Sequence, residues 1–249
     1  MLGVFKNGLV SPPKELNSPS ATNQPPAAAA NNQNPLQSFL SYHNNNVSSM
    51  SFGNDASLAY AHSSDSFLPT QRLFSSVDDI HCLFLGSLNN LCALNKQYGL
   101  NKGANESMFV IQAYKTLRDR GPYPAHSVLK DLEGSFGFVG NDGRVMLFWG
   151  ISADGSVVIS DNLEVIKNSC SKSFAPFPTG CLYHTGGELK SFEHPKNKMK
   201  AISRVDSEGA MCGATFKVDI YAKTKSMPGL EVKLIGLGAN KLDSILTFF

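Results

Sequence analysis

The spacing of apolar and polar positions predicts many short strands and few helices. Turn residues separate several of the apolar runs, such as Gly186-Gly187 and the stretch Gly140–Gly143. The predicted strands are a first piece with a turn within residues 1–10, then Ser57–Ala61, His81–Leu85, Gly134–Val139, Val145–Trp149, Ser156–Ser160, Cys181–His184 and Leu189–Phe192. Such strand-rich halves around a small number of helices favour an α+β fold, with a layered αββα arrangement as one form of it.

One segment has clear helical periodicity. Between Glu106 and Arg118, apolar residues recur at steps of three and four, as on one face of a helix: Phe109, Val110, Ala113, Tyr114 and Leu117. Asn105 is a suitable N-cap, and Gly121-Pro122 would stop the helix. A second, short helix is expected around Leu36–Tyr42.

Two regions depart from this regular pattern. Residues 11–49 are rich in Pro, Ser, Asn, Gln and Ala, which bury too little apolar surface to offset the entropy of ordering, so we expect a flexible low-complexity insert. From about Val205 the chain is less regular, although Lys217–Tyr221 and Glu231–Ile235 alternate weakly.

Composition narrows the functional classes. The chain has 249 residues, a length that suits one or two domains. Of these residues, 42% are hydrophobic and 17% are charged, and the formal net charge is +2. No basic run is typical of nucleic-acid binding, and no apolar run is long enough to span a membrane. Without a signal-peptide pattern at the start, we expect a cytoplasmic protein that could also enter the nucleus.

Cysteine and histidine spacing argues against metal centres and disulfides. The five cysteines are odd in number and form no Cys-x-x-Cys pair, and the six histidines are scattered. We therefore expect reduced thiols, no metal and no cofactor.

Two short motifs carry a resemblance to a known family. They are Tyr98-Gly99-Leu100 and Leu117-Arg118-Asp119-Arg120, accompanied by the opening Met1–Phe5 and by the segment Arg72–Asp79. With these motifs the chain resembles the plant aluminium-induced or stem-specific proteins. The resemblance implies a stress- or hormone-responsive plant protein.

That family is in turn similar to class II glutamine amidotransferases, such as the glutaminase domain of asparagine synthetase. The matching segments are Leu132–Phe138 and Phe177–Tyr183. The resemblance implies a four-layer αββα Ntn-hydrolase sandwich over residues 1–220, with 11–49 as its insert and 221–249 as a divergent tail. Relative to the family, the chain is short by about one strand after Val139, and it diverges from about Met227, as a splice variant or a gene-model error would.

The resemblance also predicts that the catalytic nucleophile is absent. These enzymes attack the glutamine amide with an N-terminal Cys whose own α-amine is the base. Here the residue after the initiator Met is Leu2, a bulky residue that usually leaves Met1 in place. The oxyanion-hole Asn-Gly pair corresponds to Leu85-Gly86, and losing one such donor typically costs about 10²–10³ in rate. No catalytic residue is therefore assigned.

Three positions could still bind an amino-acid-like ligand. Arg72 matches the residue that would pair with the ligand α-carboxylate, Glu106 the one that would hold its α-ammonium, and Gly86 keeps a backbone N–H. The structural alternative is an Arg beside a strand and a Glu that stabilises the first turn of a helix.

The expected function is therefore non-catalytic, by binding an amino-acid-like ligand or a protein partner, with a homodimer as one arrangement. The alternative is residual glutaminase or amidohydrolase activity with a non-standard nucleophile.

Overall fold

The computed structural model of the protein describes residues 1–12, 16, 34–43, 46–62, 72–78, 80–119, 129, 131–136, 147–184, 188–191, 193–205, 207, 209, 211–223 and 244–246. These residues form a mixed α+β fold with mostly antiparallel sheets, which confirms the predicted class. The helices among them are α1 (Pro35–Tyr42), α2 (Leu91–Gln97), α3 (Glu106–Asp119) and α5 (Leu163–Cys170). None of these helices is long and apolar enough to cross a bilayer.

The first strand lies inside the larger sheet. The strands of this six-stranded sheet, in spatial order, are β2 (Val47–Phe52), β3 (Ala56–Ala61), β1 (Leu2–Phe5), β8 (Val157–Ser160), β7 (Phe148–Ile151) and β9 (Phe174–Pro176). All neighbours are antiparallel, and Leu2 lies opposite Ala59 of β3 and Ser160 of β8. All four residues of β1 are buried, because the strand has a neighbour on each side and side chains packed on both faces.

The second sheet is built around β5 (Ile80–Leu88). This strand pairs with β4 (Arg72–Val77) along residues 80–85 and with β6 (Gly134–Phe136) from Gly86 onward. The short β14 (Ser244–Leu246) adds a parallel neighbour on the other side. Gly86 has φ +108°, a backbone conformation that suits glycine, at the point where β5 changes its partner strand.

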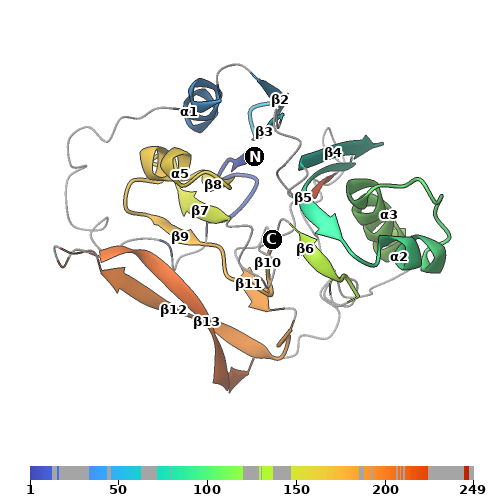
Figure 1. The fold of residues 1–249 in the computed structure, drawn as a ribbon. Helices are drawn as coiled ribbons and strands as arrows, with labels where there is room; N and C mark the ends of the chain where they lie inside the picture. Colours follow the sequence, from blue (N-terminus) through green and yellow to red (C-terminus); the bar gives the residue numbers. More distant parts are fainter. Residues whose placement is uncertain are drawn as a thin grey trace.

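Two hydrophobic clusters lie on opposite faces of the larger sheet, one toward α1 and α5 and the other toward β5 and α3, whose ribbons are drawn in Figure 1. One cluster joins the sheet to α1 and α5 and includes Leu2, Val4, Phe39 and Ile166. The other joins the sheet to β5 and α3; among its largest buried members are Phe5, Phe84, Phe109 and Trp149.

Several predicted elements are confirmed. The long helix is α3, and the amide N of Met108 donates to the Asn105 side chain (2.9 Å), as expected of an N-cap. The short helix near residue 36 is α1, and the strands at 57–61, 81–85 and 156–160 are β3, β5 and β8. The predicted hairpin strands near residues 181 and 189 are β10 (Cys181–His184) and β11 (Glu188–Ser191), paired antiparallel.

Other elements differ from the prediction. The strands β6 and β7, predicted on either side of a turn, belong to different sheets and do not form a hairpin. The region after Val205, predicted to be less regular, contains β13 (Met211–Lys223), a long strand paired with β12 (Asn197–Val205). Most of residues 11–33, Gly121-Pro122, the shortened segment after Val139 and Glu231–Ile235 lie outside the described residues.

Gly213 fixes the contact between the β12–β13 hairpin and the larger sheet. It has φ +69°, and a Cβ at this position would lie 1.7 Å from the carbonyl oxygen of Phe174 in β9. We expect Gly213→Ala to lower the free energy of unfolding by about 1–3 kcal/mol, because the strained backbone and the blocked contact both oppose the native position. Thermal unfolding measures the change. Gly209→Ala is the control, because Gly209 also has a positive φ (+79°) but a Cβ there would meet no neighbouring atom. Equal losses in the two variants would contradict the role of the Phe174 contact.

Candidate functional site

The position expected to carry a nucleophile is part of the core. The side chain of Leu2 is 0% exposed and belongs to the cluster that also contains Phe39 of α1 and Val165 of α5. Leu2 and Val4 share this face because side chains alternate along a strand. The side chain of residue 2 therefore packs toward the two helices.

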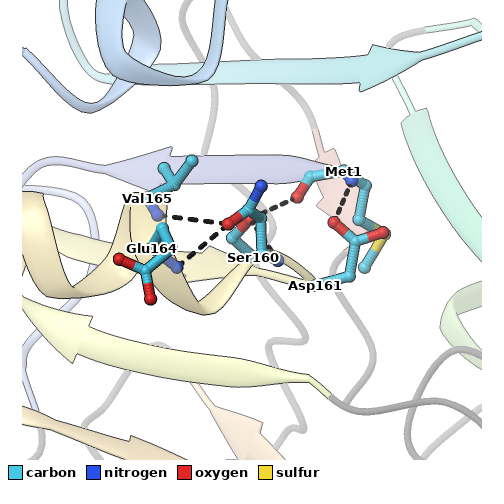
Figure 2. Close-up of polar contacts among 6 residues, drawn as sticks. Met1, Ser160, Asp161, Glu164 and Val165 are labelled. Carbon is cyan, nitrogen blue, oxygen red and sulfur yellow. Dashed lines mark hydrogen bonds and ion pairs between the residues drawn. The ribbon is translucent and has the colours of Figure 1, made fainter. Parts of the chain in front are cut away.

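The backbone of Met1 is held by the last residue of β8 and by the residue that follows it. Figure 2 shows the ammonium group of Met1 in an ion pair with the carboxylate of Asp161. The carbonyl oxygen of Met1 accepts hydrogen bonds from Ser160 Oγ (2.8 Å) and from the backbone N of Asp161 (3.4 Å). We call this group of three residues the N-terminal clamp.

The turn from β8 into α5 places Asp161 beside Met1. Asn162 caps α5, since its Oδ1 accepts from the backbone N of Glu164 (2.9 Å) and of Val165 (3.3 Å). The backbone N of Asn162 also donates to Ser160 Oγ (3.1 Å), which closes the turn. Because Ser160 and Asn162 on either side of it are both hydrogen-bonded, Asp161 is held at the end of β8. There it lies alongside the start of β1.

The clamp uses the groups that an N-terminal hydrolase would need for chemistry. A base must be within reach of a nucleophile that can give up its proton. The Met1 ammonium is instead paired with Asp161, and the buried Ser160 hydroxyl donates to the Met1 carbonyl. Leu2 follows Met1 and lies opposite Ser160 in the strand pairing, and its side chain has no nucleophilic atom.

The three predicted ligand residues come together at one end of β5. The backbone of Arg72 lies opposite Leu85, Gly86 is the next residue of β5, and Oε1 of Glu106 accepts from the backbone N of Leu88 (3.5 Å). The Arg72 side chain lies outside the described part. Leu85, which the resemblance matched to an oxyanion-hole residue, is 1% exposed and belongs to the core.

The structure separates Leu2 from these residues. The side chain of Leu2 belongs to the cluster under α1 and α5, whereas Leu85 and Leu88 belong to the cluster on the opposite face of the larger sheet. The nucleophile position and the end of β5 therefore do not face one another across a shared pocket among the described residues.

The two sequence motifs lie near the ends of helices. Tyr98 follows α2, and its ring meets that of Phe109 in α3 edge-on at 5.2 Å. Burial and the nearby charge of Asp131 raise the pKa of Tyr98. The second motif begins within the last turn of α3. The Tyr98 contact packs α2 against α3, which is a structural role.

Three of the four described cysteines are too deeply buried to supply an alternative nucleophile. Cys82, Cys170 and Cys181 are buried, and burial raises the pKa of each thiol to about 12. Since the thiolate is the reactive form, these three thiols are unreactive near neutral pH. Cys92 is exposed on α2.

This difference predicts a thiol count. In a Cys212→Ser background, one thiol should react with a disulfide reagent at about pH 8, near the pKa of a free thiol, and four should react after denaturation. In Cys92→Ser/Cys212→Ser, none should react in the folded state. Rapid labelling of Cys82 in the folded protein, located by mass spectrometry, would contradict its burial.

Comparison with known proteins identifies the family. The family described as "Aluminium induced protein" matches residues 2–218. The chain is also 37% identical over 139 residues to the stem-specific protein TSJT1 of Nicotiana tabacum, a match that covers 56% of this chain and 91% of that relative. The resemblance predicted from the paired motifs is thereby confirmed, and the chain belongs to the aluminium-induced protein family.

Proposed function

We propose that this protein is a non-catalytic, amidotransferase-like protein that acts by binding and not by chemistry. The observation that carries the proposal is the complete burial of Leu2, at the position where a class II amidotransferase needs its nucleophile. Leu85 adds support, because its apolar side chain occupies the position of an oxyanion-hole donor.

The proposal includes the four-layer αββα sandwich of the Ntn hydrolases, over residues 1–220. It is supported by the placement of α1 and α5 on one face of the six-stranded sheet and of α3 against β4 and β5. The cluster that joins the two sheets would be the centre of the sandwich.

An amino-acid-like ligand is the binding partner that the end of β5 supports. Arg72 and Glu106 carry the opposite charges that an α-carboxylate and an α-ammonium require, and both lie near residues 85–88. The contact of Glu106 with the Leu88 amide would then position its carboxylate.

Calorimetry with glutamine, asparagine and aspartate tests this ligand class. We expect one of the three to bind, and Arg72→Ala to weaken that binding about tenfold or more, as expected for a lost charge-assisted hydrogen bond. Arg204→Ala, on the β12–β13 hairpin, is the matched control and should leave the affinity unchanged. If none of the three amino acids binds, the end of β5 has only a structural role.

Residual glutaminase activity is the competing proposal. A thiol-reactive glutamine analogue should leave Cys82, Cys170 and Cys181 unlabelled, because these thiols are buried and protonated. Labelling of one cysteine together with ammonia release from glutamine would favour the enzyme.

The relatives support a stress-related role in a plant. One name describes induction by aluminium and the other describes expression in the stem. We expect the amount of this protein to rise after aluminium exposure of the source tissue, as measured by quantitative immunoblotting. An unchanged amount would contradict this part of the proposal.

A further inference from the structure

The β12–β13 hairpin has an inner face packed on the protein and an outer face in solvent. Phe216 and Ala214 of β13 are buried, and the Phe216 ring lies 5.4 Å from that of Trp149. Met199 and Ala201 of β12 pack against the same cluster. Figure 1 shows the hairpin along the lower edge of the molecule, with β9 and β11 as its neighbours.

The outer face carries lysines that lie close together. Lys198, Lys200 and Lys217 are exposed, and Lys200 lies directly opposite Lys217 in the strand pairing. Like charges directly opposite one another on neighbouring strands destabilise a sheet. Lys196 and Lys223 add two further exposed cations at the same end of the hairpin.

The carboxylate on these strands has a structural task. Asp219, opposite Lys198, accepts hydrogen bonds from the backbone N of Tyr221 (2.9 Å) and of Ala222 (3.1 Å). These bonds hold the irregularity in the pairing next to Asn197. Among the described residues no carboxylate forms an ion pair with Lys200 or Lys217.

The same hairpin concentrates exposed apolar side chains. Four of the five large hydrophobic residues that are exposed in the described part lie on it, and the fifth is Tyr42. They are Ile202 (44% exposed), Val205 (60%), Ile220 (67%) and Tyr221 (91%). Ile202 shares the outer face with Lys198 and Lys200, because alternate residues of a strand point to the same side. Of the four, Ile202 is the one that the strand pairing places beside the lysines.

We propose that the outer face of the β12–β13 hairpin docks on an anionic lipid membrane. Lysines gain from the negative potential of such a leaflet, while Tyr and aliphatic side chains gain from the boundary between headgroups and acyl chains. A membrane therefore uses both kinds of side chain on this hairpin. A second copy of the chain, placed face to face, would set Lys200 and Lys217 against the same lysines, and a nucleic acid would leave Ile202 without a partner.

Vesicle flotation with the full-length chain tests the proposal. We expect binding to vesicles that contain about 30% phosphatidylserine in phosphatidylcholine and at least tenfold weaker binding to phosphatidylcholine alone. Raising the salt from about 0.1 M to about 0.5 M should weaken the binding, because it screens exposed charges.

Paired variants distinguish binding through the lysines of the outer face from a general effect of the protein's net charge. Lys200→Glu/Lys217→Glu should weaken binding about thirtyfold or more, at roughly fivefold for each lysine lost near the surface. The control Lys96→Glu/Lys102→Glu makes the same change in net charge at exposed positions elsewhere and should stay within about threefold of the wild type. Ile202→Ser/Tyr221→Ser should weaken binding about tenfold. Unchanged melting temperatures establish that each variant is folded.

Three results would overturn the proposal. The first is a wild-type chain that does not bind phosphatidylserine vesicles. The second is an equal loss in the two lysine pairs, which would show a general charge effect. The third is stronger binding to a single-stranded oligonucleotide or to polyglutamate than to vesicles, unaffected by Ile202→Ser/Tyr221→Ser, which would assign the outer face to that partner.

Discussion

Leu2→Asn should lower the free energy of unfolding by about 3–5 kcal/mol. The substitution removes a fully buried leucine, worth about 1.5–3 kcal/mol, and leaves an amide without partners in an apolar cluster, at a further cost of about 1–3 kcal/mol. Asparagine has the same branched outline as leucine, so less cavity forms than with alanine. Denaturant unfolding followed by circular dichroism measures the change.

Leu2→Met is the matched control for this position. It keeps an apolar side chain of similar size and should cost less than about 1.5 kcal/mol. Intact-mass measurement should show that each variant differs from the wild type only by the substitution. This result establishes that Met1 is present in every variant. If both substitutions cost less than about 1 kcal/mol, residue 2 does not pack in the core, and the reading of this position as structural is wrong.

Asp161→Ala should cost about 3 kcal/mol, because it leaves the Met1 ammonium without its carboxylate. Removing one partner of a buried ion pair typically costs about 3–5 kcal/mol. The lower end applies here, since the Asp161 side chain is 12% exposed and water can reach it. Hydrogen exchange should also become faster at the backbone amides of β1 and β8, whose ends the N-terminal clamp joins.

Glu164→Ala is the control for Asp161→Ala. Glu164 is also near the start of α5, and its ion pair with Lys167 lies at the surface. Removing an exposed pair of this kind costs at most about 0.5 kcal/mol. Equal losses in the two variants would mean that the N-terminal clamp adds no stability beyond an ordinary surface pair.

Elements with a clear period or cap were predictable from the sequence. The apolar residues of α3 recur at helical steps after the Asn105 cap, and β8 is a compact β-branched run. The strand β12 also carried a signal that was missed, because Lys198, Met199, Lys200 and Ala201 alternate as a half-buried strand requires. The cap of α5 at Asn162, before a run of apolar positions, is a second missed signal.

The face to which Leu2 points could not be predicted. The strand β1 is buried on both faces, so its sequence is apolar throughout and does not distinguish them. The lack of a nucleophilic atom at residue 2 follows from the sequence alone, but the packing of the Leu2 side chain under α1 and α5 depends on residues more than 30 positions away. The pairing of Met1 with Asp161, 160 positions apart, likewise follows from the sheet order and not from local sequence.

The positions of Arg72, Gly86 and Glu106 illustrate an intermediate case. Family resemblance predicted all three, and the structure brings their backbones or side chains to one end of β5. It also gives structural tasks to two of them, since Gly86 marks the change of partner strand and Glu106 bonds to the Leu88 amide. Their proposed role in ligand binding therefore rests on the calorimetry described above.

Steady-state ammonia release from glutamine tests the central claim most directly. With Leu2 in the core and Met1 paired to Asp161, the purified wild-type protein should release no ammonia above the buffer background at any protein concentration. Ammonia release that rises in proportion to protein concentration, and that is lost when a single residue of this chain is replaced, would contradict the claim that the protein is non-catalytic.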